Sequence, residues 1–285
     1  MIRLDGATVL LQWATGGLLF LWVTTRRRQV GIGYGWLLRG TFGVMAVGAV
    51  VVGRVFGPVP VRDVSSALVA LSTGAALVLS IVRRRAGVAG ERARHERRSA
   101  RVAAMTGIER EPSGPDPTVP EFPPVVDVMA PVVGVVGLVA AGVAAGGPDG
   151  LAVVRTLVGA VFLGAVTDAM LLGHWYLVQP GLGRAPLLEL NRWLAWVWPF
   201  EVAALLWPTG MLSVFSGRID DGYGGMLGWF WATCAVSTLI LTAVTKAALK
   251  ERAYSAVMAA TGLLYLAILT AFGTDLVARA VLSSS

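Results

Sequence analysis

The sequence predicts an all-α integral membrane protein, a polytopic bundle of about eight transmembrane helices. Hydrophobic residues make up 55% of the chain and charged residues only 14%, against the roughly 25% that is typical of soluble domains. Eight apolar stretches are each long enough to cross a hydrocarbon core about 30 Å thick. Because lipid offers the backbone no hydrogen-bond partners, stretches this long and continuous are expected to be helices.

The predicted spans fall on either side of one long loop. Residues 1–82 hold the first three spans, residues 83–124 form the loop, and residues 125–285 hold the other five. The spans are Ala7–Thr25, Gly35–Gly53, Val64–Val82, Val125–Ala145, Leu151–Val178, Leu187–Phe215, Gly225–Leu249 and Tyr254–Leu282.

Basic residues are distributed unevenly between the two sides of this topology. The loops after spans one, three, five and seven carry 4, 9, 2 and 3 of the 24 Lys and Arg residues. Six are expected on the opposite side: Arg3, Arg54, Arg62, Arg155, Arg218 and Arg279. Since loops rich in Lys and Arg stay in the cytoplasm, we expect a plasma (inner) membrane protein with both termini outside. This topology accounts for the net charge of +7 without a nucleic-acid partner, and leaves membrane lipid and other membrane subunits as the expected partners.

The long loop changes character halfway along. Its first half, Arg83 to Arg110, is rich in Arg and permits a helix, whereas the second half carries six prolines and reads as an extended linker. The basic half has two interpretations: a helix lying on anionic headgroups, where each basic residue contributes about 1 kcal/mol, or a solvated loop whose charge retains it inside.

Span five becomes polar toward its cytoplasmic end, at Asp168, His174, Trp175 and Tyr176. An ionisable residue inside a span is costly and is a functional-site hypothesis by default. On a straight helix Asp168 and His174 lie about 9 Å apart along the axis, too far for a direct hydrogen bond, so a joint role needs a cleft or a partner helix. The alternatives are an interfacial aromatic belt around His174 and a structural, hydrogen-bonded carboxyl at Asp168.

Span six places Glu201 between Pro199 and Pro208. A proline inside a helix frees the carbonyl four residues earlier, here those of Ala195 and Ala204. Broken helices of this kind supply carbonyls and a carboxylate to coupling ions in transporters. We therefore class Glu201, with Lys246 of span seven, as candidate ion or proton residues; the alternative is a kinked packing helix.

Several kinds of chemistry find no support in the sequence. Cys234 is the only cysteine and no Cys/His metal spacing exists, so no metal ligands are assigned. A bis-His haem needs two intramembrane histidines, and only His174 qualifies. No catalytic residues are assigned, and the sequence does not decide whether the protein is an enzyme.

Three functions are compatible with these features. The first is a membrane subunit or accessory protein of an electron-transfer or proton-handling assembly that binds a quinone-like ligand. Its expected site comprises His174, Asp168, Trp175, Tyr176, Trp193, Arg184 and Arg192. The second is a secondary transporter with a coupling-ion site at Glu201, and the third is a non-catalytic membrane scaffold.

Overall fold

The computed structural model describes residues 4–107, 116, 119–146, 149–179 and 181–283. Arg110, Pro180 and most of the proline-rich linker lie outside these residues. The described chain contains helices and no strands, which confirms the predicted all-α class.

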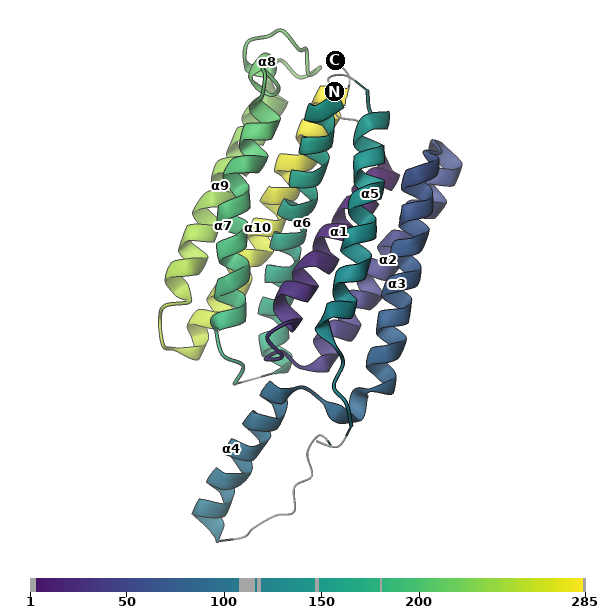
Figure 1. Cartoon of the computed structure of the whole chain (residues 1–285). Helices are drawn as coiled ribbons and strands as arrows, with labels where there is room; N and C mark the ends of the chain where they lie inside the picture. The colour runs from purple at the N-terminus through teal and green to yellow at the C-terminus, as the bar shows by residue number, and fades with distance from the viewer. Residues whose placement is uncertain (1–3, 108–115, 117–118, 147–148, 180, 284–285) are drawn as a thin grey trace.

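Eight long helices form the body of the protein, and shorter helices connect them (Figure 1). The long helices are α1 (Gly6–Thr25), α2 (Ile32–Phe56), α3 (Pro60–Val82), α5 (Met129–Ala144), α6 (Asp149–Val178), α7 (Ala185–Leu206), α9 (Met226–Ala248) and α10 (Tyr254–Ser283). The connecting elements are the 3₁₀ turns η1 (Arg84–Ala86) and η2 (Pro124–Val128) and the helices α4 (Ala89–Thr106) and α8 (Leu212–Phe215).

Seven of the described helices are long and apolar enough to cross a membrane, so the chain is an integral membrane protein. Helix α7 is not among the seven. Although it has 22 residues, its polar content is high because it carries Glu189, Arg192 and Glu201. It nevertheless packs inside the bundle against α6 and α9. The count of eight spans therefore stays a prediction.

The long helices pack as two groups of four. Helices α1, α2, α3 and α5 contact one another in one group, and α6, α7, α9 and α10 do so in the other. Helix α6 joins the groups by packing against both α1 and α5. At the crossing of α1 and α6, a Cβ on Gly164 would lie 2.2 Å from the carbonyl carbon of Gly16, so only glycine permits this close backbone approach.

Helix α7 ends earlier than the sequence predicts. The expected span ran to Phe215, but the helix stops at Leu206 and Trp207 is extended. Pro208 has no backbone N–H to donate to the carbonyl of Ala204, and its ring disfavours a helical conformation in the preceding residue. The proline therefore terminates the helix, whereas Pro199 is accommodated within it.

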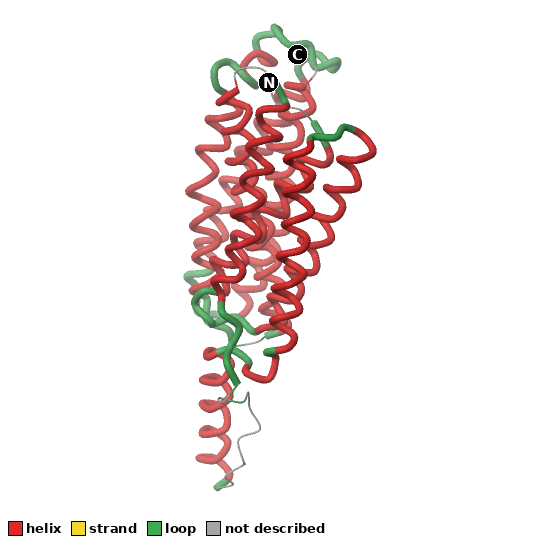
Figure 2. Tube along the Cα trace, turned by 45° about the vertical axis from the view of Figure 1, so that its right-hand side comes forward, coloured by secondary structure: helices red, strands yellow, loops and turns green. Residues whose placement is uncertain are grey.

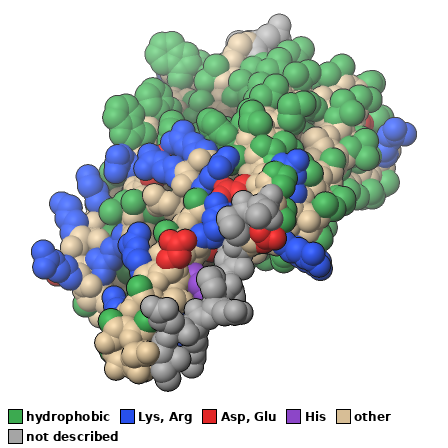
Figure 3. All heavy atoms as spheres, turned by 60° about the horizontal axis from the view of Figure 1, so that its bottom comes forward, with side chains coloured by type: hydrophobic (Ala, Val, Ile, Leu, Met, Phe, Trp, Pro, Cys, Tyr) green, Lys and Arg blue, Asp and Glu red, His purple; other side chains and the backbone are tan. Residues whose placement is uncertain are grey.

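The two ends of the bundle differ. The first turn of α1 and the last turn of α10 lie at one end, hereafter the termini end, and α4 projects from the opposite end, hereafter the α4 end (Figure 2). Basic side chains gather over the α4 end, and apolar side chains cover the flank of the bundle visible behind it (Figure 3). Helix α4 points away from the bundle (Figure 1, Figure 2), and its contact with lipid headgroups stays a prediction.

Four basic residues are buried inside the bundle rather than exposed at its ends: Arg39, Arg62, Arg155 and Arg279. The sequence analysis had counted each of them toward the charge of a membrane face. Of the six expected at the termini end, only Arg3, Arg54 and Arg218 therefore remain as candidates for surface charge there. The asymmetry between the two ends is larger than the sequence count indicated.

Candidate functional site

Glu201 lies on α7 with none of its surface exposed. Its carboxyl interacts with Asp275 and Arg279 from α10 and with Arg155 from α6. Three helices thus bring two carboxyls and two guanidiniums together in the part of the bundle nearest the termini end. With all four ionised the formal charges balance, which reduces the cost of keeping them away from water.

Asp275 and Arg279 form an ion pair within α10. They are spaced i, i+4 on one face of the helix, and Nε of Arg279 donates to Oδ2 of Asp275 at 2.7 Å. Gly159 on α6 makes room for the pair, since a Cβ there would lie 2.8 Å from Oδ1 of Asp275 and 2.2 Å from Nε2 of Gln12. Gln12 on α1 therefore belongs to the same buried cluster, which spans both groups of helices.

Arg155 holds the end of α7. Its Nε donates to the carbonyl of Ala204 at 2.9 Å and its Nη2 to the carbonyl of Trp207 at 2.6 Å. The last carbonyls of a helix have no partner within it, and a cation at this end is favoured by the helix dipole. The Ala204 carbonyl was expected to be free for a coupling ion. It is already taken by a guanidinium, so that part of the ion-site hypothesis is wrong.

Several polar atoms of the cluster have no hydrogen-bond partner among the described residues, although they are buried. They are both amide atoms of Gln12, both carboxyl oxygens of Glu201, Oδ1 of Asp275, and Nη1 and Nη2 of Arg279. Buried polar groups are nearly always satisfied in proteins, by water or a ligand where not by the chain itself. Seven such atoms lie in one cluster, which makes this cluster the candidate functional site.

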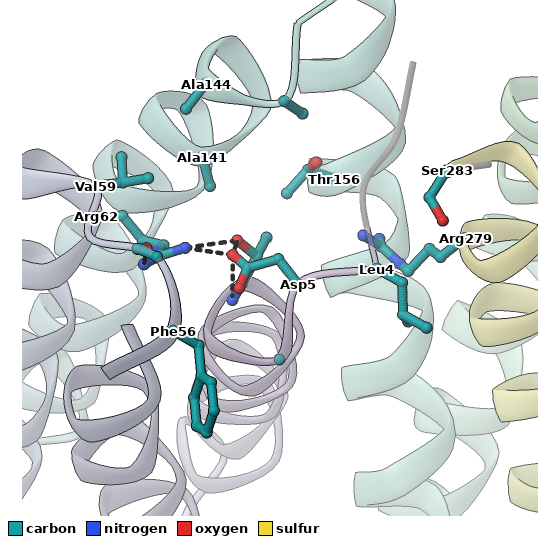
Figure 4. A pocket seen from close by; sticks show the side chains of 14 residues that line it. Leu4, Asp5, Phe56, Val59, Arg62, Ala141, Ala144, Thr156, Arg279 and Ser283 are labelled. Atoms are coloured by element: carbon teal, nitrogen blue, oxygen red, sulfur yellow. Dashed lines mark hydrogen bonds and ion pairs between the residues drawn. The ribbon is translucent and has the colours of Figure 1, made fainter. Parts of the chain in front are cut away.

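A cavity of about 470 Å³ at the termini end reaches this cluster (Figure 4). It lies between the two groups of helices, with walls from the start of α1, the α2–α3 turn, and the ends of α5 and α10. The guanidinium of Arg279 is directed from α10 toward the cavity, with Thr156 of α6 beside it. Arg279 therefore connects the cavity to Asp275 and, through it, to Glu201.

The other arginine on the cavity wall, Arg62, is fully engaged. It pairs with Asp5 and with Asp63, and its Nη2 also donates to the carbonyl of Gly57 at 2.7 Å. Arg62 therefore joins the start of α1 to the α2–α3 turn, and its role is structural.

The predicted residues of span five face different neighbours. Asp168 is fully buried, and neither of its carboxyl oxygens has a hydrogen-bond partner among the described residues. His174 is exposed on the bundle surface, where its Nδ1 lies 3.2 Å from the hydroxyl of Tyr265. Trp175 packs against Tyr34 of α2, with ring centroids 5.9 Å apart.

Two further residues of the predicted quinone site make structural contacts. Tyr176 donates from its hydroxyl to the carbonyl of Gly183 at 2.5 Å. Arg184 donates to the carbonyls of Leu249, Arg252 and Ala253, and so ties the α6–α7 turn to the α9–α10 turn.

Arg192 and Trp193 lie apart from those residues. Together with Glu189 and Trp196 they line a cavity of about 270 Å³ on α7. Lys246 is exposed near the end of α9 and does not join Glu201. Of the predicted site residues, only Glu201 lies in the buried charged cluster at the termini end.

The sequence analysis missed the partners of Glu201. Arg155 and Arg279 were counted among the charges of one membrane face, and Asp275 was not singled out as a site residue. The spacing of Asp275 and Arg279, one helical turn apart inside an apolar stretch, was the available signal. Gln12, an amide within span one, was a weaker signal.

The described residues contain no group of three or more His, Cys, Asp and Glu side chains suited to a metal ion. No family model, no curated protein and no solved structure matches the chain. A function is therefore inferred from the buried charged cluster around Glu201 and from the cavity at the termini end.

Proposed function

We propose that the protein is a secondary transporter that couples movement of a solute to movement of a proton, with Glu201 and Asp275 as the proton-exchanging carboxyls. The observation that carries the proposal is the electrostatic interaction between these two buried carboxyls, which come from different helices. Two adjacent carboxylates repel each other, so a single proton shared between them has a large effect on the cluster. Ionisable groups inside a membrane bundle commonly mark proton or substrate pathways.

The position of the cluster supports transport. It includes Gln12 from one group of helices and Glu201, Asp275 and Arg279 from the other, next to the crossing of α1 and α6. Many transporters bind substrate and coupling ion between two helical units and alternate access by moving one unit against the other. A change of charge at this position would act on the contact between the two groups.

A proton suits this site better than a metal cation. A bound sodium ion needs several oxygen ligands, and Arg155 already occupies the carbonyls of Ala204 and Trp207. Two guanidiniums close to Glu201 also repel any added cation. Protonation of a carboxyl requires no additional ligands.

Transport in proteoliposomes tests the proposal. The purified protein would be reconstituted with a panel of labelled anionic, neutral and cationic solutes, and uptake measured with and without a pH gradient. We expect uptake of one class to depend on the gradient, and Glu201→Gln to abolish that dependence. Glu189→Gln is the matched control, because Glu189 lies on the same helix but pairs with Arg26 and Arg27 outside the cluster. Gradient-driven uptake that survives Glu201→Gln unchanged would refute the proposal.

A second candidate is the quinone-binding subunit. The cavity lined by Glu189, Arg192, Trp193 and Trp196 favours it, since it joins indole rings to charged groups as an amphipathic ligand requires. A photoreactive quinone analogue should then label α7 in this region, and quinone should be extractable from the purified protein. Labelling confined to other helices would count against it.

A further inference from the structure

We infer that the transported solute is a small oxyanion, bearing a carboxylate or a phosphate, and that Arg279 binds it from the cavity at the termini end. The inference rests on the proposed function and adds to it the chemical class of the solute. It follows from the hydrogen bonding of Arg279, from the charge of the cluster and from the size of the cavity.

Arg279 has two donor nitrogens, Nη1 and Nη2, without a hydrogen-bond partner among the described residues, and its side chain forms part of the cavity wall. The residue has no exposed surface. The Nε bond to Asp275 fixes the plane of the guanidinium. A guanidinium held in this way binds two oxygens of a carboxylate or phosphate side by side, a geometry that neutral and cationic solutes do not match.

The cavity offers no competing cation of this kind. Arg62, on the opposite wall, pairs with Asp5 and Asp63 and donates to the carbonyl of Gly57. The volume of about 470 Å³ suits a small molecule and is within the usual range of ligand pockets. An anion that enters from the termini end therefore meets Arg279 as the available positive group.

The charge of the cluster links the anion to the proton. Arg155, Arg279, Asp275 and Glu201 sum to zero when all are ionised, and to +1 when Glu201 and Asp275 hold one proton between them. The ionisable groups that interact with Glu201 are those three, from α6 and α10. A bound anion offsets the positive charge of the protonated cluster. Anion and proton should therefore bind together and cross the membrane together.

Binding to purified protein in zwitterionic lipid nanodiscs tests the inference. Inorganic phosphate and succinate are the soluble probes, and nanodiscs that contain phosphatidic acid form a separate arm. We expect a soluble probe to bind, with about one proton taken up per anion when calorimetry is repeated in buffers of different ionisation enthalpy. Arg279→Gln should weaken binding at least about 10-fold, as expected for loss of hydrogen bonds to a charged group, and Arg279→Lys should restore part of it.

Glu201→Gln separates the two parts of the proposal. The glutamine side chain of this variant is neutral at any pH, so the cluster keeps the net charge of +1 that favours an anion. This variant should retain anion binding and lose proton uptake. If the wild-type protein binds the anion, Arg279→Gln does not, and no transport is detected, the transporter proposal is refuted and the anion site is supported. Gradient-driven uptake of only neutral or cationic solutes would support the transporter proposal and refute the anion site.

A protection measurement avoids the risk that Arg279→Gln fails to fold. Ser283 lines the cavity and is exposed, so Ser283→Cys in a protein lacking Cys234 should react with a water-soluble thiol reagent. Phosphate or succinate should slow the reaction while Arg279 is intact. Slower reaction only in phosphatidic acid nanodiscs would identify a lipid headgroup as the bound oxyanion and overturn the soluble solute. An unchanged rate in every arm would overturn the anion site altogether.

Discussion

The guanidinium of Arg39 and the carboxylate of Asp127 form a two-point ion pair inside the bundle. Nε donates to Oδ1 and Nη2 to Oδ2, both at 2.8 Å. Phe122 lies over the guanidinium, with 4.3 Å between its ring centroid and Cζ of Arg39. The pair joins α2 to the turn before α5, across 88 residues of chain that include the whole long loop.

Loss of Arg39 should strongly destabilise the protein. Arg39→Met leaves Asp127 buried without its counter-charge, at a cost of about 3–5 kcal/mol in the free energy of unfolding. Denaturant unfolding in detergent would measure the change. The double variant Arg39→Met with Asp127→Leu should recover most of the loss, because no buried charge then remains unpaired. A double variant as unstable as the single one would show that the pair itself has a different role.

The crossing of α1 and α6 should tolerate nothing larger than glycine. Gly164→Ala places a methyl group 2.4 Å from the carbonyl oxygen of Gly16, a backbone atom that cannot rotate away. We expect the two groups of helices to separate at this point and the melting temperature in detergent to fall. Gly262→Ala is the control, since a Cβ there meets no atom within 4 Å and alanine favours the helix by up to about 1 kcal/mol. Equal melting temperatures for the two variants would contradict the close packing.

The loop before α9 should loosen at low pH. Three backbone N–H groups, of Gly225, Tyr223 and Leu227, donate to the partly exposed carboxylate of Asp221 and hold its pKa below the ordinary value of 3.8. A lowered pKa in the folded protein means that the carboxylate stabilises the loop at neutral pH, and that this contribution is lost as the pH falls through about 4 and below. The protection factors of the amide hydrogens of residues 222–227, which are exchange rates corrected for the intrinsic effect of pH, should therefore fall over that interval.

Asp221→Asn is the control for the acid effect. The amide keeps one oxygen acceptor but does not titrate in this range, so the protection of residues 222–227 should be lower at neutral pH and should change less between pH 5 and pH 2. Acid dependence as steep as in the wild type would assign the effect to another group.

The orientation in the membrane can be tested by labelling single cysteines after replacement of Cys234. We expect Asp220→Cys to react from outside sealed cells, and Ser99→Cys and Glu251→Cys to be protected, because basic residues gather at the α4 end. Permeabilisation should expose the protected positions and serves as the control. Reaction of Ser99→Cys in sealed cells would show that the topology is the reverse of the predicted one, with the cavity at Arg279 facing the cytoplasm.

Hydropathy alone predicts most of the fold. Span length locates the long helices, because burial in lipid and the need to satisfy backbone hydrogen bonds act on each segment independently. The error at α7 has a local cause, since Pro208 ends the helix at a point where hydropathy remains high.

The site was only partly predictable, because it depends on which face each helix turns toward its neighbours. Glu201 was identified by the cost of an ionisable group within a span. Arg155 and Arg279 are as deeply buried, yet near the ends of apolar stretches an arginine reads equally well as a membrane-face charge. His174 shows the opposite case. An ionisable residue inside an apolar run was expected to belong to an interior site, but His174 lies on the bundle surface. Rotation of a helix about its axis is fixed by packing, which the sequence of one segment does not reveal.

Helix α4 carries exposed charge away from the body of the bundle (Figure 1). Its 18 residues extend about 27 Å from a base fixed by the Gly90 N–H, which donates to the carbonyl of Arg28, and by Arg94, which donates to that of Gln29. At physiological salt, charges are screened within about 8 Å. The far arginines, Arg97, Arg98 and Arg101, are exposed, and their attraction to a partner of opposite charge is expected to weaken as the salt concentration rises.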